Sequence, residues 1–131
     1  MTKPFHLSFA VPNLEDVRKF YINILGCKVG RDTGKWIDVM FFGHQITIHQ
    51  ESEEMHSNPI DHFGAVLSKC DWVAMSNTLS SRGIAFKSNP TIREAGTDFE
   101  SGKFTIKDPA SNVLEFKYYE SFNATMTDNN E

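Results

Sequence analysis

The chain has 131 residues, a length that favours one domain. Hydrophobic residues make up 40% of it and charged residues 23%, which is ordinary for a soluble globular protein. The net charge of −4 comes without a basic stripe, which argues against nucleic acid and anionic membranes as partners. No run approaches the ~20 apolar residues of a membrane span. Two cysteines are too few for a disulfide framework and no signal peptide is recognisable, so we expect a cytoplasmic protein.

The first predicted element is a strand over residues 5–11, in which large apolar residues alternate with small or polar ones. His6 lies on the polar side of this strand. A helix is expected next, because Asn13 is a good N-cap and apolar residues recur at helical spacing over residues 14–25. Gly26 is the expected stop of that helix.

Three short strands are predicted to follow. They span residues 27–31, 36–42 and 45–50, with turns at Thr33-Gly34 and Gly43-His44. In the last of them, Ile46 and Ile48 share one side, and His49 lies on the other.

The same plan then repeats. The chain predicts a strand over residues 62–68, a helix capped by Asp71 and ended by Gly83, and strands over 85–88, 103–107 and 112–118. His62 lies opposite the large apolar residues of its strand, as Glu115 does in the last one. The polar, glycine-containing segment 89–102 is predicted to be a long loop, of the kind that often serves as a lid or binding loop.

Spacing supports an internal duplication. From the strand histidine to the helix-ending glycine there are 20 residues in the first copy (His6 to Gly26) and 21 in the second (His62 to Gly83). We therefore predict an α+β fold of two tandem βαβββ modules. One domain is expected over residues 1–119, with module one at about 4–50, a linker at 51–60 and module two at about 61–119; a polar tail follows at 120–131.

Four positions are candidate metal ligands: His6, His49, His62 and Glu115. Imidazole and carboxylate suit iron, zinc, nickel or manganese, and each of the four lies on the polar side of a predicted strand. A three-ligand site of His6, His62 and Glu115 would leave His49 as a nearby acid/base or substrate-facing group.

Other polar or aromatic residues have plainer explanations. Ordinary surface positions are expected for His44 and His56, and a solvated charge pair for Arg93 and Glu94, although that pair could meet an anionic substrate. Tyr118 falls on the helix-facing side, which favours core packing. Three further aromatic or apolar residues could line a pocket or belong to the core: Trp36, Met40 and Phe104.

The sequence resembles the vicinal oxygen chelate superfamily, which includes glyoxalases, bleomycin- and fosfomycin-resistance proteins and extradiol dioxygenases. The resemblance covers residues 4–119 and rests on four motifs: Phe5-His6, the helix end Phe20-Tyr21 to Leu25-Gly26, Asp61-His62-Phe63, and Asp108-Pro109 to Asn112-Val113-Leu114-Glu115-Phe116. It is nearest to a subgroup of single-domain proteins named as extradiol-type dioxygenases. The family fold implies a curved mixed sheet around a central metal, ligands at His6, His49, His62 and Glu115, and a homodimer.

Two departures from the family pattern stand out. His49 occupies a position where glyoxalase-like members typically have a glutamate, which removes one negative charge from the metal shell and argues against glyoxalase chemistry. The turn after Pro109 is Ala110-Ser111-Asn112, in which Asn112 is expected to take up the left-handed conformation.

Three functions remain open at this point. Two histidines and one carboxylate leave three adjacent positions on a metal, which favours an Fe(II) dioxygenase acting on a small molecule that chelates through two oxygens. If His49 also binds, a redox-inert Ni or Zn would act as a Lewis acid in a glyoxalase-type lyase or isomerase. The third possibility is a non-catalytic protein that binds a small molecule, as drug-resistance members do.

Overall fold

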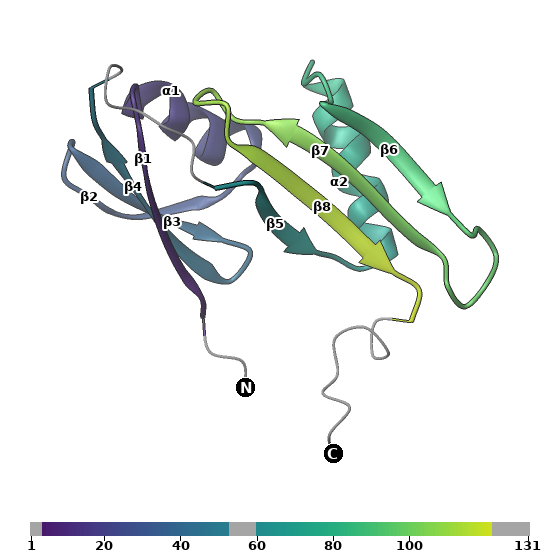
Figure 1. The fold of residues 1–131 in the computed structure, drawn as a ribbon. Coiled ribbons are helices and arrows are strands. Elements are labelled where there is room, and N and C mark those ends of the chain that lie inside the picture. The colour runs from purple at the N-terminus through teal and green to yellow at the C-terminus, as the bar shows by residue number, and fades with distance from the viewer. Residues whose placement is uncertain (1–3, 53–59, 122–131) are drawn as a thin grey trace. The chain divides into compact units, whose positions relative to one another are not determined.

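The computed structural model describes residues 4–52 and 60–121, and its contacts divide the chain into two compact units. Unit one comprises Met1–Asp61 together with Asp108–Asn112, and unit two comprises His62–Lys107 and Val113–Glu131. Each unit contains one four-stranded mixed sheet (Figure 1). The duplicated βαβββ plan and the α+β class are thus confirmed. In the described part of the chain, no helix has the length and apolar character needed to cross a membrane.

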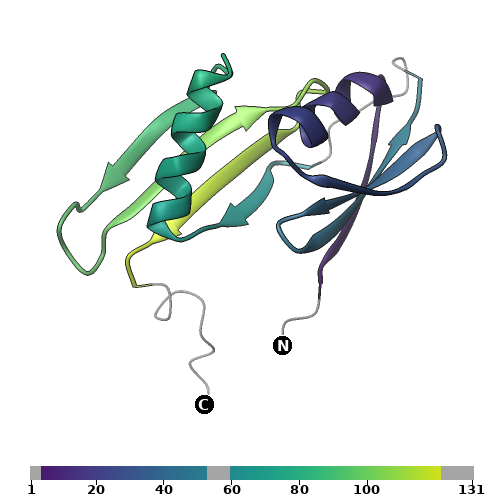
Figure 2. The same cartoon turned by 180° about the vertical axis from the view of Figure 1, so that it is seen from behind.

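Unit one follows the predicted order of elements. They are β1 (His6–Val11), α1 (Leu14–Lys19), a π-helical turn η1 (Phe20–Ile24), β2 (Lys28–Asp32), β3 (Trp36–Phe41) and β4 (His44–Gln50). The strand order is β1-β4-β3-β2, with β1 parallel to β4 and the other neighbours antiparallel. Helix α1 covers one face of this sheet (Figure 2).

The first helix begins where the sequence predicts and ends differently. The Asn13 side chain accepts a hydrogen bond from the Asp16 backbone N at 3.0 Å. The predicted single helix over 14–25 is instead a short α-helix continued by η1, in which the Leu25 backbone N donates to the Phe20 carbonyl at 3.0 Å. Gly26 then takes a φ of 78°, the left-handed conformation expected of a helix stop.

The hairpin between β3 and β4 turns one residue earlier than predicted. Phe42 and Gly43 both have positive φ, 49° and 83°, which is the pattern of a type I′ turn. His44 is therefore not a turn residue but the first residue of β4, where its Nδ1 accepts a hydrogen bond from the Phe5 backbone N at 2.6 Å. The predicted turn position of His44 was wrong, because the sequence marks Gly43 as a turn residue but does not mark Phe42 as the other one.

Unit two repeats the arrangement. Its elements are β5 (Phe63–Val66), α2 (Lys69–Ser81), β6 (Ser88–Arg93), β7 (Ser101–Lys107) and β8 (Val113–Tyr119). The strand order is β5-β8-β7-β6, with β5 parallel to β8. Figure 2 shows α2 lying across one face of this sheet.

Three predictions in this unit were wrong. Ser68, not Asp71, caps α2: its Oγ accepts from the Asp71 backbone N at 3.1 Å, which leaves Asp71 inside the first turn. The segment 89–102 is not one long loop, because half of it forms β6 and the start of β7, and only 94–100 connects them. Of the predicted strand over 85–88, only Ser88 lies in a strand, as the first residue of β6. A polar segment can still form a strand when a neighbouring strand supplies its backbone hydrogen bonds, as β7 does for β6.

A buried aromatic cluster fixes α2 on its sheet. The Trp72 Nε1 donates to the Phe116 carbonyl at 2.9 Å, and its ring lies 4.9 Å from that of Tyr118. Opposite Tyr118 on β7 is Gly102, where a Cβ would come within 2.2 Å of the Tyr118 ring. Tyr118 is fully buried, which agrees with the packing role that the sequence favoured, as the burial of Phe104 does for the core alternative at that residue.

Glu100 is the last residue of the β6–β7 connection. Its Oε2 accepts from the Tyr118 hydroxyl at 2.8 Å and from Lys69 Nζ at 2.7 Å, and its Oε1 accepts from the Gly96 backbone N at 2.8 Å. The hydrogen bond from Lys69 is the largest of the effects that lower the pKa of Glu100 to about 2. The connection is thereby anchored to both β8 and α2.

The β7–β8 turn, Asp108–Asn112, is held by one carboxylate and counts among the residues of unit one. Asp108 Oδ1 accepts from the backbone N of Ala110 and of Asn112, at 2.9 and 2.8 Å, and Oδ2 accepts from the Tyr21 hydroxyl at 3.0 Å. The left-handed residue is Ser111, with φ 68°, and not Asn112 as predicted. Asn112 is buried, and its side-chain amide donates to Asp108 Oδ2 at 3.0 Å.

Candidate functional site

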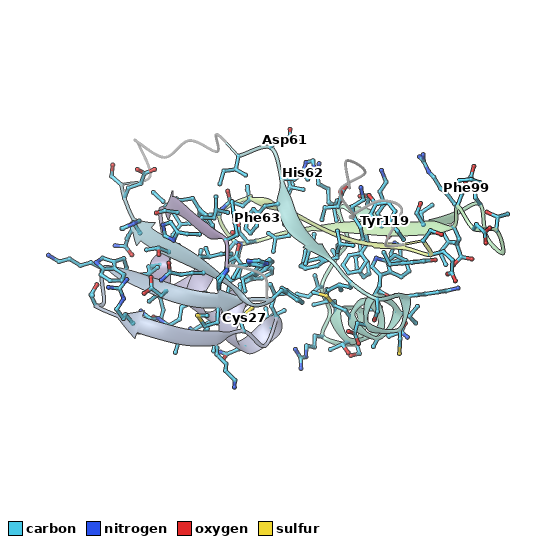
Figure 3. The ribbon with its side chains drawn as sticks, turned by 90° about the horizontal axis from the view of Figure 1, so that it is seen from below. Cys27, Asp61, His62, Phe63, Phe99 and Tyr119 are labelled. Atoms are coloured by element: carbon cyan, nitrogen blue, oxygen red, sulfur yellow. The ribbon has the colours of Figure 1, made fainter. Side chains whose placement is uncertain are left out.

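The sheet of unit two has one apolar and one polar face. The side chains facing α2 belong to fully buried residues: Phe104, Ile106, Leu114, Phe116 and Tyr118. Alternation places Glu115, Lys117 and Tyr119 of β8 on the other side, which we call the polar face. Figure 3 shows α2 against one side of this sheet and His62, at the entrance to β5, on the other.

His62 and Glu115 meet on the polar face. The Nε2 of His62 lies 3.8 Å from Oε1 of Glu115, and the two side chains are 47% and 17% exposed. Their proximity follows from the ladder, since Gly64 faces Glu115 in the parallel β5–β8 pair and His62 precedes Gly64 by two residues on the same side. Of the predicted ligands, these two are brought together within one unit.

A hollow of about 200 Å³ adjoins this pair. It is lined by His62, Gly64, Ala65, Val66, Glu115 and Lys117. Gly64 is required here, because a Cβ at that position would lie 1.6 Å from the Glu115 backbone oxygen. The Lys117 Nζ lies 3.7 Å from Glu115 Oε1 and 5.2 Å from the centre of the Tyr119 ring. A hydrogen bond with the Tyr119 side chain is the largest effect on the pKa of Lys117 and raises it, and the charge of Glu115 raises it further.

His6 and His49 are not neighbours in unit one. In the parallel β1–β4 pair, His6 faces Gln45 and His49 faces Ala10, so the two histidines are separated by four residues of ladder, about 13 Å. His6 Nδ1 lies 2.8 Å from Gln45 Oε1, and His49 Nε2 lies 3.1 Å from Ser8 Oγ.

The ladder also shows which positions correspond between the units. One step before Phe63↔Leu114 would put His62 opposite Val113, and Glu115 lies two residues further along β8. In unit one His6 faces Gln45, and the residue two further along β4 is Thr47. His49 therefore corresponds to Lys117 and not to Glu115. Counting residues from the ends of the strands could not reveal this, because the ladder alone fixes which residues face each other.

Thr47 belongs to a buried polar network that the sequence analysis missed. Its Oγ1 donates to Asp38 Oδ1 at 2.8 Å, and Arg31 Nε donates to Asp38 Oδ2 at 2.6 Å. Burial opposes ionisation of Asp38, but these two hydrogen bonds outweigh it and lower its pKa. The only available signal was alternation, which puts Asp38 on the polar side of β3 between Trp36 and Met40.

The remaining candidates fall in various places. Arg93 is the last residue of β6 rather than a loop residue, and Glu94 follows it with a φ of 52°. Trp36 is half-buried and 6.2 Å from the His49 ring, and Met40 is 44% exposed. His56 lies outside the described residues, as do most of the predicted linker and tail.

A divalent metal needs more donors than one pair supplies. Over residues 4–52 and 60–121, no three His, Cys, Asp or Glu side chains are grouped closely enough to hold a metal ion. The pair His62–Glu115 itself fits, because two donors each about 2.1 Å from one ion lie roughly 3 to 4 Å apart. In unit two, the structure thus places two candidate metal donors side by side.

Comparison with known proteins identifies the family. The sequence model of the Glyoxalase/Bleomycin resistance protein/Dioxygenase superfamily matches residues 3–116. The chain belongs to this superfamily. No match was found among curated protein sequences. Members of the superfamily generally use divalent metal ions, typically bind small molecules and often form dimers.

Solved structures agree with this assignment. A glyoxalase/bleomycin resistance protein/dioxygenase from Alicyclobacillus acidocaldarius is 32% identical, with a TM-score of 0.78 and 96% of each chain covered. The fosfomycin resistance protein FosX of Listeria monocytogenes is 15% identical, with a TM-score of 0.69 over 90% of this chain and 93% of that one. A glyoxalase/dioxygenase from Nostoc punctiforme is 17% identical, with a TM-score of 0.70 over 89% and 90%. The last two show the fold alone.

Proposed function

We propose that this superfamily member is a metal-dependent enzyme that acts on a small molecule chelating through two oxygens, and that its reaction is of the Fe(II) dioxygenase type. The observation that carries the proposal is the His62–Glu115 pair, 3.8 Å apart beside a hollow of about 200 Å³. Imidazole and carboxylate are the donors expected for a non-haem iron site with open positions. Family membership supports the metal but not the choice of reaction.

His6 is proposed as the third ligand. It occupies the ladder position in unit one that matches His62 in unit two. His6 comes two residues before the residue of β1 that faces Thr47, and His62 comes two residues before the residue of β5 that faces Glu115. His49 lies about 13 Å further along the β1–β4 ladder than His6. We therefore propose His49 as an acid/base group or an alternative ligand, rather than as a partner of His6 on one ion.

The residues of unit two have distinct tasks in this proposal. Glu115 brings negative charge to the cation, and its carboxylate is partly sheltered, with 17% of the side chain exposed. Lys117 Nζ, 3.7 Å from Glu115 Oε1, can hold an anionic oxygen of the substrate beside that carboxylate. A bound divalent ion would supply Lewis acidity and, as Fe(II), electrons for dioxygen chemistry.

A non-catalytic binding protein is the second candidate. It is favoured by one observation, that the described part of the chain groups two metal donors and not three. A Ni- or Zn-dependent lyase has less support, because Thr47 rather than an acid occupies the position in unit one that matches Glu115.

The test is metal content by elemental mass spectrometry on untagged protein purified without oxygen. Near-stoichiometric iron is expected, together with oxygen uptake in the presence of catechols. Glu115→Ala should lose the metal, whereas Asp98→Ala, which removes an exposed carboxylate from the β6–β7 connection, should keep it. Nickel or zinc with anaerobic activity on a thiol adduct of an α-ketoaldehyde would replace the dioxygenase by the lyase. Protein that neither contains nor takes up metal would overturn both enzymatic proposals.

A further inference from the structure

A second hollow opens on the polar face of unit two, next to the first. Its volume is about 230 Å³, and it is lined by three cationic side chains, Arg93, Lys103 and Lys117, and by three hydroxyl-bearing residues, Thr91, Ser101 and Tyr119. No acidic side chain is among the described residues that line it. Lys117 lines both hollows, so they adjoin at that residue.

The strand register explains how three cations come together. Lys103 of β7 faces Lys117 of β8 on one side and Thr91 of β6 on the other. Two residues along, Ser101 faces Tyr119 and Arg93. These six side chains form two adjacent rows across β6, β7 and β8, all on the polar face.

This arrangement is unfavourable without a counter-ion. Like charges directly opposite each other destabilise a sheet, as Lys103 and Lys117 are here. Lys117 has Glu115 at 3.7 Å, but among the described residues neither Arg93 nor Lys103 has a carboxylate within 4.0 Å. Cations in a hollow with hydroxyl donors around them form the kind of surface that binds an oxyanion.

We propose that this hollow binds the anionic end of the substrate, a carboxylate, phosphate or phosphonate, while the chelating oxygens of the same molecule lie at the His62–Glu115 hollow. Only the placement of the chelating oxygens at the His62–Glu115 hollow rests on the proposed function. Glu115 and Lys117 are two residues apart on β8, about 7 Å, which sets the spacing between the two groups of the substrate. The substrate class is therefore a small oxygen-chelating acid.

Inorganic phosphate is the probe for the hollow. Metal-free protein is titrated at pH 8 and constant ionic strength, and backbone amide shifts are followed by NMR. Saturable shifts are expected at Ser101–Lys103 and at Lys117. Arg93→Ala and Lys103→Ala should each raise the Kd at least fivefold, and Lys103→Arg should restore most of the affinity because it keeps the charge.

The matched control is Lys107→Ala. Lys107 is exposed, lies on the same strand and the same side as Lys103, and is four residues away from it, about 13 Å. Its loss should change the phosphate Kd less than twofold. Equal weakening by Lys107→Ala and Lys103→Ala, or shifts that do not saturate, would overturn the proposal.

Glu115→Ala separates this proposal from the metal proposal. It should abolish metal uptake and leave phosphate binding intact or stronger, because it removes a negative charge from beside Lys117. Phosphate binding without any metal uptake by the unaltered protein would overturn the proposed function and leave the anion site standing. Metal uptake without phosphate binding would do the reverse.

Discussion

The buried hydrogen bond between Tyr21 and Asp108 gives a prediction whose size follows from the structure. Tyr21 is fully buried, and its hydroxyl donates to Asp108 Oδ2 at 3.0 Å. Tyr21→Phe removes that oxygen and leaves the ring in place, so it creates no cavity. A hydrogen bond to a charged group contributes about 1.5–3 kcal/mol. We expect the lower end, about 1.5 kcal/mol, because Asp108 Oδ2 keeps the hydrogen bond from Asn112 Nδ2 at 3.0 Å.

Urea unfolding followed by circular dichroism measures this change. A loss of about 1.5 kcal/mol is roughly a tenfold fall in the folding equilibrium constant, with an unchanged m-value. Tyr119→Phe is the control. It removes a hydroxyl that interacts with Lys117 at a partly exposed position, where water can replace the lost partner, so stability should change by less than about 0.5 kcal/mol. If Tyr21→Phe were as stable as the control, the argument that Tyr21 anchors the Asp108–Asn112 turn would be refuted.

Three further predictions concern the site and the ionisable groups. Gly64→Ala should lower both the melting temperature, measured by calorimetry, and metal uptake, measured by elemental analysis. The reason is that the new Cβ would lie 1.6 Å from the Glu115 backbone oxygen and push β5 away from β8. Unchanged metal uptake would contradict this prediction. Glu100 has a folded-state pKa of about 2, below its unfolded value, so its contribution to stability is present above about pH 4 and lost as the pH falls towards 2; urea unfolding at pH 6 and pH 3 should show a smaller acid loss in Glu100→Gln. Burial raises the pKa of Cys27 to about 11, so at pH 8 Cys27 should react with a disulfide reagent more slowly than the exposed Cys70. Equal reaction rates in the two single Cys→Ser variants would contradict this prediction.

Local patterns in the sequence predicted the elements of unit one well. The Asn13 cap and the Gly26 stop depend on side chains and φ angles within a few residues, which the sequence displays directly. In unit two, one prediction failed because two local signals competed, and another failed because a local signal was missing. Ser68 and Asp71 are both good caps, and only the start of α2 at Lys69 decides between them. Strand β6 has no apolar alternation to mark it, and its pairing with β7 supplies what its sequence lacks.

The candidate site shows the same division. Alternation along each strand put His62 and Glu115 on the polar sides of their strands, and the ladder brings them to 3.8 Å. Alternation also put His49 on the polar side of β4, but it has a period of two and cannot distinguish a residue from its neighbour two positions away. The β1–β4 register assigns the matching level to Thr47.

By itself, the sequence determined the duplicated βαβββ plan, the caps and stops of its first helix, and the side of each strand on which the polar residues lie. These depend on interactions between residues close together in the chain. The tertiary structure alone decided the register between strands, and with it the meeting of His62 with Glu115, the separation of His6 from His49, and the gathering of Arg93, Lys103 and Lys117. Register is set by hydrogen bonds and packing between strands that are distant in sequence, so no local pattern contains it.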